Sequence, residues 1–194
     1  MIENILSVIS QWIISVIAQS GYWGVVGLMA VESANIPLPS EVIMPFAGFL
    51  ASRGELTVWG AGFAGGLGCT IGSAVSWWIG RYGGRRAVEK YGRFVLLSSG
   101  DVERGERWFR RWGHSIAFFS RLLPVVRTFI SFPAGIARVP LGIFLLYTFL
   151  GSVIWSTVLA WVGKQLGDNW ESVKSYFHGA DWVVVVVIVA CVVW

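Results

Sequence analysis

Two proline-containing motifs place charged side chains inside long apolar runs of this chain. The motifs are Glu32-x4-Pro37-x-Pro39-x-Glu41 and Arg121-x2-Pro124-x2-Arg127. The apolar runs around them extend from about residue 22 to 50 and from about 116 to 137. A charged side chain at membrane depth costs about 2.5–3.5 kcal/mol on insertion scales, so it usually faces a partner, a cavity or a pathway. Because proline interrupts a helix and interrupted backbone is not tolerated against lipid, both motifs are expected inside the protein, around a polar site of the kind that transporters have.

The composition is that of an integral membrane protein. Of its 194 residues, 55% are hydrophobic and 13% are charged, and this length predicts one membrane domain over residues 1–194. Residues 1–20 lack a basic segment and a small-residue cleavage site, so no cleavable secretion signal is expected. Cys69 and Cys191 predict neither a disulfide nor a metal site, and no cofactor is expected. The net charge of +4 indicates membrane topology and lipid contact, not nucleic acid.

The sequence contains two copies of one unit. A shift of 87 residues places Pro37, Ala47 and Gly48 on Pro124, Ala134 and Gly135. In the helix that follows, a shift of 83 places Gly68, Ser73, Trp78, Gly80 and Gly84 on Gly151, Ser156, Trp161, Gly163 and Gly167. The shift changes because the connector before the helix is longer in the first copy. Repeat A is therefore assigned to about 24–84 and repeat B to about 113–167.

Each unit is predicted to be a proline-broken hairpin followed by a spanning helix. The hairpins, about 32–52 and 115–138, are too interrupted to be straight spans and are expected to be re-entrant. The helices, about 57–80 and 141–163, are long enough to cross a hydrocarbon core of about 30 Å. One crossing separates the hairpins, so they enter from opposite faces and the repeat is inverted. The residues expected to break the hairpins are Pro37, Pro39, Pro45, Pro124, Pro133, Gly48 and Gly135. The predicted fold class is an all-α polytopic membrane protein.

The orientation follows from the loop of about 81–112 between the two units. Residues 81–111 hold nine Lys or Arg against four acids, so the positive-inside rule makes this loop cytoplasmic. The second hairpin then opens to the cytoplasm and the first to the outside. Basic and aromatic residues alternate over 101–112, which suits a helix lying on the anionic lipids of the inner leaflet. The alternative is a solvated loop with ordinary topogenic charges.

The chain ends and the first long helix give less specific signals. Residues 1–20 are either an interfacial helix or, as we favour, a span continuing towards Leu28. Residues of about 180–194 are expected to be a last, anchoring span, and a tail is expected to follow because no interfacial anchor closes it. The glycines of 59–80 have the small-xxx-small spacing that lets helix backbones touch. Their expected neighbour is a hairpin of the same chain, with a homodimer as the alternative.

Arg121 and Arg127 are the predicted binding residues for an anion. A guanidinium keeps its charge when desolvated and grips phosphate or carboxylate with two hydrogen bonds. Backbone N–H groups freed by Pro124 and Pro133 can add to such a site. The alternative is that each arginine pairs with a glutamate to hold the hairpins together, and the two roles are compatible.

Glu32 and Glu41 are the predicted proton-coupling residues. Low dielectric favours the protonated carboxyl, whereas a nearby arginine favours the charged form. An anion that displaces a glutamate from its arginine would therefore let that glutamate take a proton, after which the loaded site changes face. A purely structural role for both acids is the alternative. His114 and His178 are expected to be inert at the interface. No enzyme is expected, because no histidine pair of the kind that lipid phosphatases need follows Pro39-Ser40-Glu41.

These motifs resemble those of the DedA family of bacterial membrane proteins, which is related to the VTT-domain scramblases of eukaryotes. The matching segments are residues 32–41, 45–48, 120–127 and 133–135, and the resemblance covers about 20–170. It implies a fold of two inverted re-entrant hairpins, each packed on a spanning helix. It also implies proton-dependent return of undecaprenyl phosphate across the cytoplasmic membrane for reuse in cell-wall synthesis. Other members are linked to the movement of phosphatidylethanolamine.

By this resemblance, Glu32 and Glu41 are the membrane-embedded acids, and Arg121 and Arg127 are the paired arginines. One departure is that some members carry Pro-Gly-Asp where this chain has Pro39-Ser40-Glu41. The expected function is a flippase that returns undecaprenyl phosphate from the outer to the inner leaflet of the bacterial cytoplasmic membrane. The alternatives are a translocase of phospholipids such as phosphatidylethanolamine, a proton-coupled small-ion transporter, and a non-transporting membrane scaffold.

Overall fold

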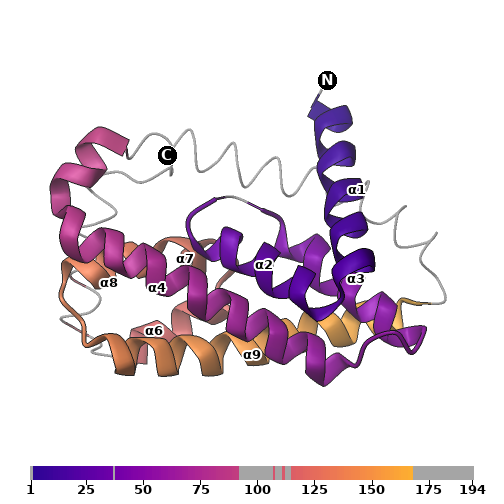
Figure 1. The fold of residues 1–194 in the computed structure, drawn as a ribbon. Coiled ribbons are helices and arrows are strands. Elements are labelled where there is room, and N and C mark those ends of the chain that lie inside the picture. The colour runs from indigo at the N-terminus through magenta and orange to yellow at the C-terminus, as the bar shows by residue number, and fades with distance from the viewer. Residues whose placement is uncertain (1, 37, 92–106, 108–110, 112–114, 168–194) are drawn as a thin grey trace.

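The structure is a computed structural model that describes residues 2–36, 38–91, 107, 111 and 115–167. In these ranges the chain is all-helical and contains no strand, which confirms the all-α part of the predicted class (Figure 1). Several predicted features lie outside the described residues: most of the loop 81–112, the span 180–194, Pro37, His114 and His178.

A glycine turn separates the first two helices, α1 (Ile2–Ser20) and α2 (Tyr22–Ser33). Gly21 has φ +55°, a conformation that only glycine adopts without strain. The prediction that one span continues towards Leu28 is therefore wrong. In Figure 1, α1 stands upright, whereas α2 runs across the view. The two helices touch near this turn, because a Cβ atom on Gly24 would lie 2.9 Å from the carbonyl oxygen of Val16.

The first hairpin consists of α2 and α3 (Ser40–Ser52), so it begins earlier than the predicted residue 32. The chain breaks between them, where Asn35 has φ +70° and Pro39 is extended just before α3. Pro45 lies inside α3 and does not end it. The carbonyl that Pro45 leaves without a donor is that of Glu41, in the first turn, where the helix tolerates the loss.

The second hairpin is divided into short pieces. They are α6 (Ser115–Phe119), the 3-10 helix η2 (Ser120–Leu122), α7 (Pro124–Phe129) and α8 (Ser131–Ile136). Pro124 is the first residue of α7, a position that does not need a backbone N–H. Pro133 lies in the first turn of α8. The prediction that Pro45, Gly48 and Gly135 break the hairpins is wrong, since all three lie within helices.

Two long helices complete the described fold, α4 (Val58–Tyr91) and α9 (Leu141–Gln165). The segment Val58–Gly83 and the whole of α9 are long and apolar enough to cross a membrane. The two helices lie side by side and run in opposite directions (Figure 1). Gly62 faces Thr157 and Gly66 faces Val153 so closely that any side chain there would clash. The glycines of α4 therefore serve close packing within the chain.

One arm of each hairpin packs against the long helix of the other unit, while the other arm packs against the long helix of its own unit. Gly48 of α3 lies against the backbone of Ala160 and Lys164 in α9, with no room for a Cβ atom. Gly135 of α8 lies in the same way against the backbone of Trp77 and Arg81 in α4. The two glycines are 87 positions apart, and their partners are 83 apart, which are the two shifts of the sequence repeat. The two units are therefore interlocked by equivalent contacts.

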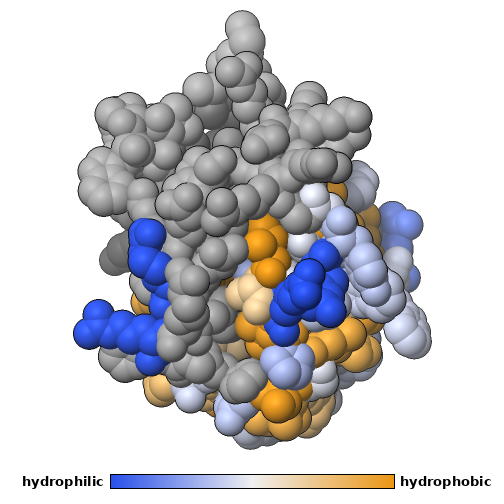
Figure 2. All heavy atoms as spheres, turned by 90° about the vertical axis from the view of Figure 1, so that its left-hand side faces the viewer, coloured by the Kyte–Doolittle hydropathy of each residue, from blue (hydrophilic) through white to orange (hydrophobic). Residues whose placement is uncertain are grey.

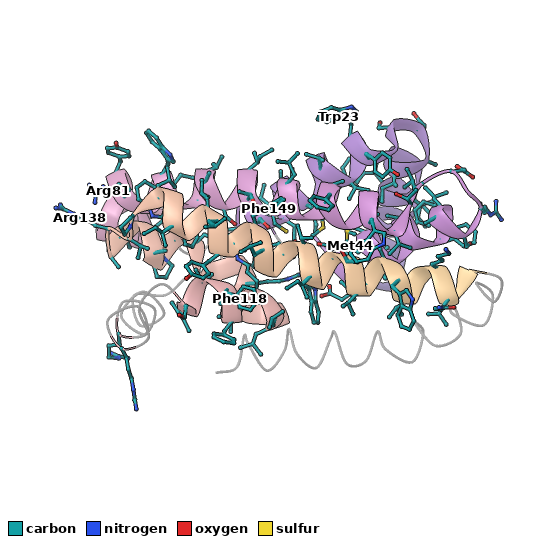
Figure 3. The ribbon with its side chains drawn as sticks, turned by 90° about the horizontal axis from the view of Figure 1, so that it is seen from below. Trp23, Met44, Arg81, Phe118, Arg138 and Phe149 are labelled. Carbon is teal, nitrogen blue, oxygen red and sulfur yellow. The ribbon has the colours of Figure 1, made fainter. Side chains whose placement is uncertain are left out.

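The outer faces of both long helices are apolar. Large exposed hydrophobic residues follow one another along them: Phe63, Leu67, Ile71 and Val75 on α4, and Leu146, Leu150, Ile154 and Val158 on α9. Apolar faces of this extent are typical of surfaces in contact with lipid. At one end of these helices, Arg81 and Arg138 lie together (Figure 3). Figure 2 views that end and shows strongly hydrophilic side chains beside hydrophobic ones, the arrangement expected at a membrane–water interface.

Candidate functional site

Arg127 of α7 is the centre of a polar site where three helices meet. Its Nη2 donates to Oε1 of Glu32 at the end of α2, at 2.9 Å. The same nitrogen donates to Oγ of Ser40 and lies 3.6 Å from Oε1 of Glu41, both in the first turn of α3. The structure therefore brings three of the four predicted charged residues to one place.

The breaks in the hairpins explain how these side chains reach each other. Leu123 is extended and Pro124 starts α7, which places Arg127 one turn into a new short helix. Pro39 is likewise extended and starts α3, which places Ser40 and Glu41 at its beginning. The backbone at the two interruptions is not wholly buried, since Ile36 and Leu123 are more than half exposed, but the charged side chains of Glu32 and Arg127 beside them are buried.

The two acids differ in their environment. Glu32 is 5% exposed, whereas the side chain of Glu41 is 45% exposed. The inner pair of Glu32 and Arg127 is therefore desolvated, and removing one partner of such a pair costs about 3–5 kcal/mol because the other charge stays buried. The outer contact of Glu41 is longer and more solvated, so its contribution to stability is within about 1 kcal/mol.

Arg121 is 1% exposed and is held differently. Its Nη1 donates to the carbonyl oxygen of Arg127 at 2.8 Å, and its Nη2 donates to Oγ of Ser131 at 2.8 Å. Its guanidinium carbon lies 6.0 Å from the centre of the Phe144 ring. No described carboxylate lies within ion-pair distance of Arg121. The prediction that each arginine pairs with a glutamate therefore applies to Arg127 only.

Asn35 fixes the break of the first hairpin to the first long helix. Its side chain is buried, and its Oδ1 accepts a hydrogen bond from Oγ of Ser76 in α4 at 2.8 Å. Asparagine tolerates the positive φ found here better than most residues. This bond holds the end of α2, and with it Glu32, against α4.

Both arginines of the site have a buried donor that no described acceptor occupies. Nε of Arg121 and Nε of Arg127 are both buried and have no hydrogen-bond partner. Buried donors of this kind are costly unless they have an acceptor. Among the described residues, no group of three His, Cys, Asp or Glu is placed to hold a metal ion. The chemistry that this arrangement offers is anion recognition by two arginines, with carboxylates that compete for one of them.

A family model named the VTT domain matches residues 38–165. The chain belongs to the VTT-domain family, the DedA family of bacterial membrane proteins. Ser40, Glu41, Arg121 and Arg127 lie within the matched residues, and Glu32 lies just before them. The resemblance found in the sequence motifs is therefore confirmed.

Three curated relatives match most of the chain. An alkaline phosphatase-like protein of Lactococcus lactis is 38% identical over 181 residues, which covers 91% of this chain and 85% of the relative. Undecaprenyl phosphate transporter A of Bacillus subtilis is 38% identical over 173 residues, covering 89% and 83%. The protein of the same name in Staphylococcus aureus is 27% identical over 188 residues, covering 95% and 93%. No solved structure matches the chain.

The sequence analysis of this VTT-domain protein did not predict a role for three residues of the site: Ser40, Ser131 and Trp155. Ser40 and Ser131 are hydrogen-bond partners of the two arginines, and Trp155 lies with its ring 5.9 Å from the guanidinium carbon of Arg127. The repeat carries a signal for the first of these, since a shift of 87 places Ser40 on Arg127. Nothing in the sequence distinguishes Ser131 and Trp155 from other serines and tryptophans of the chain.

Proposed function

We propose that this protein carries undecaprenyl phosphate from the outer to the inner leaflet of the bacterial cytoplasmic membrane. Two relatives that match most of the chain are named for transport of this lipid, and the two apolar helices are long enough to span a membrane. The observation that carries the proposal is the buried Arg127. Its Nη2 pairs with Glu32, whereas its Nε has no hydrogen-bond partner. A transporter, and not an enzyme, is the class that these names and this site favour.

The first step is exchange of a carboxylate for a phosphate on Arg127. Nε and Nη2 lie along one edge of the guanidinium, and Glu32 occupies only Nη2. A phosphate has oxygens spaced to take both donors of that edge, which is the stronger, two-pronged interaction. Arg121 adds a second buried positive charge that has no carboxylate partner in the described part of the chain. The substrate therefore gains more from the site than Glu32 does.

The second step is uptake of a proton by the displaced Glu32. A carboxylate that loses its arginine while only 5% exposed is desolvated, and the neutral form is then favoured. Glu41 is more exposed and lies on the same arginine. We therefore assign Glu41 the role of passing the proton from water to Glu32, so that transport of the phosphate and uptake of a proton are coupled.

In the third step, the loaded site becomes open to the other side of the membrane. We assign this movement to the two units, acting as an inverted repeat of re-entrant hairpins. Support comes from α4 and α9, which run in opposite directions, and from the equivalent glycine contacts that each hairpin makes with the other unit's helix. Repeats of this kind move by rocking against each other around a central site. The bond between Arg127 and Glu32 joins the two hairpins. Replacement of Glu32 by phosphate on Arg127 therefore removes one link between the two units.

The hydrocarbon tail stays at the lipid-facing side of the protein. An apolar hollow of about 440 Å³ lies between α2, α4 and α9 and is lined by Tyr22, Trp23, Phe63 and Leu67 among others. Figure 3 shows Trp23 at the rim of the molecule, pointing outward. Because α2 rises about 1.5 Å per residue, Val26 in this hollow lies about 9 Å along the helix from Glu32. An apolar hollow on a lipid-facing surface suits a hydrocarbon tail and favours a lipid over a small ion as the substrate.

The test is transport of undecaprenyl phosphate in proteoliposomes with an imposed pH gradient. We expect transport by the wild type and its loss in Arg127→Ala and Arg127→Lys, because lysine keeps the charge but not the two-pronged geometry. Arg81→Ala, which removes an exposed arginine outside the site, is the matched control and is expected to transport normally. Thermal unfolding of each variant in detergent separates lost transport from lost fold.

Parallel vesicles with phosphatidylethanolamine or with inorganic phosphate distinguish the other substrates. Transport of phosphatidylethanolamine in place of the prenyl phosphate would favour the phospholipid translocase. No transport of any of the three by folded wild type would overturn the proposal and leave a scaffold. Full activity of Arg127→Lys would exclude the two-pronged grip.

A further inference from the structure

Trp155 of α9 places an unused donor beside the central arginine. The Arg127 guanidinium carbon lies 5.9 Å from the centre of the Trp155 ring. The indole Nε1 is buried and has no hydrogen-bond partner, and Nε of Arg127 is in the same state. By contrast, the buried Nε1 of Trp77 donates to the carbonyl oxygen of Val139 at 3.1 Å. The two tryptophans therefore differ in whether the indole N–H has an acceptor.

These two neighbouring groups cannot satisfy each other. An indole N–H and a guanidinium N–H are donors only, so each needs an acceptor from elsewhere. Nearly all buried polar groups in proteins have a partner, and leaving one unmet costs about 1–3 kcal/mol. Two unmet donors, on groups whose guanidinium carbon and ring centre are 5.9 Å apart, fit a ligand that offers several acceptor oxygens.

We propose that Trp155 is a further binding residue for the substrate's phosphate group and that its indole N–H donates to that group alongside Nε–H of Arg127. This inference rests on the proposed function, because it takes a phosphate ester as the ligand. The tetrahedral phosphate presents oxygens in several directions, so one phosphate can accept from both groups. The anion would also be favoured by the positive charge of Arg127 beside it.

This role gives the substrate a way to rearrange the site. In the structure, Arg127 connects the second hairpin to Glu32 and Ser40 of the first unit. A phosphate held between Arg127 and Trp155 connects the same hairpin to α9, the long helix of its own unit. Binding therefore transfers the contacts of Arg127 from one unit to the other, which is the change that rocking of the units needs.

The direct test compares Trp155→Phe with Trp161→Phe. Both changes remove an indole N–H and keep an aromatic ring on the same helix, but Trp161 is 52% exposed and lies outside the site. Binding of a short-chain prenyl phosphate to purified protein in detergent is measured by calorimetry. We expect about tenfold weaker binding by Trp155→Phe, as for loss of one hydrogen bond to a charged group. Binding by Trp161→Phe is expected to equal that of the wild type.

A spectroscopic measurement follows the donor itself. The indole ¹H–¹⁵N signal that is missing from the spectrum of Trp155→Phe belongs to Trp155. We expect this signal to shift when the prenyl phosphate is added to wild type, and not when the uncharged prenyl alcohol is added. The same shift with inorganic phosphate would assign the contact to the phosphate group alone. A shift only with the prenyl phosphate would require the lipid.

The outcomes separate this inference from the proposed function. If wild type binds the prenyl phosphate and Trp155→Phe binds it equally well, with no shift of the Trp155 signal, the inference is overturned and the proposed function stands. If folded wild type binds no phosphate compound at all, both are overturned. Weaker binding by Trp155→Phe but not by Trp161→Phe, together with the shifted signal, supports the inference.

Discussion

The two hairpins occupy equivalent places in the two units but are built differently. In the first, α2 and α3 are regular helices of 12 and 13 residues with one break between them. The second covers residues 115–136 in four pieces, and the longest of these has six residues. Helices this short leave most of their end groups without intrahelical partners. In the second hairpin, side chains must therefore form the hydrogen bonds that the helical backbone forms in the first.

Arg121 supplies that replacement. It donates to the carbonyl oxygen of Arg127, which is among the last carbonyls of α7, and to Ser131 at the start of α8. One guanidinium thus joins three of the four pieces of the hairpin. The first hairpin has the acids and a regular backbone, whereas the second has the arginines and an irregular one. Neither hairpin holds a complete site, so the site exists only when the two units are docked.

The strongest way to break this comparison is to separate the units at their glycine contacts. Gly48→Val and Gly135→Val each place a side chain where the backbone of the opposite long helix lies. We expect both to destabilise the fold by on the order of 3 kcal/mol, at the upper end of overpacking effects. Thermal unfolding in detergent measures the loss.

Gly27→Ala and Gly142→Ala are the matched controls, because no atom lies within 4 Å of a Cβ atom at either position. Alanine is the better helix former there, so these variants are expected to be at least as stable as the wild type. Equal stability of Gly48→Val or Gly135→Val and the wild type would contradict the interlocked packing.

A second comparison separates the buried acid from the exposed one. Glu32→Gln keeps the shape of the inner side chain but removes the charge that pairs with Arg127 and the carboxyl that takes the proton. We expect transport driven by a pH gradient to fall more than tenfold. Glu41→Gln alters a longer, 45% exposed contact and is expected to lower transport about threefold, since exposed pairs contribute at most about 1 kcal/mol. A larger effect at Glu41 than at Glu32 would reverse the proposed roles.

The smallest expected effect concerns the ends of the two hairpins. Gly54 follows α3 with φ +78°, and Arg138 follows α8 with φ +57°. Non-glycine residues in this region cost about 1–2 kcal/mol, while the flexibility of glycine in the unfolded chain offsets part of the gain. Arg138→Gly is therefore expected to stabilise the protein by about 0.5–1 kcal/mol, and Gly54→Arg to destabilise it by about 1 kcal/mol. Thermal unfolding of the pair tests whether the two ends are equivalent.

The sequence alone predicted the long helices well. Apolar runs of the right length gave spans of about 57–80 and 141–163, and the structure has helices over Val58–Tyr91 and Leu141–Gln165. Charge in an apolar setting also led to Arg127, Glu32 and Glu41, because the cost of an unpaired charge is large wherever it is buried. Long apolar runs and charges within them are strong sequence signals, because burying either involves free energies of several kcal/mol.

The sequence predicted less well where a residue type can have more than one structural role. Proline and glycine each have two roles, since they break helices and also allow close contact. Pro45 and Gly48 have the second role in α3, where the backbone of α9 lies against them. Gly21 is one of 24 glycines, and only the structure shows that the chain turns there. Ser131 and Trp155 were not predicted because their role depends on which side chain of another helix lies opposite.

The crosswise packing also sets an order of events during synthesis of the chain. Glu32 is made 95 residues before Arg127, which takes the ribosome roughly 5–20 s. The interval between synthesis of Gly48 and synthesis of its partner Ala160 is longer still. During this interval the first hairpin lacks both Arg127 and the backbone of α9 against which Gly48 packs. Packing of the first half is therefore completed only after the last half has been synthesised.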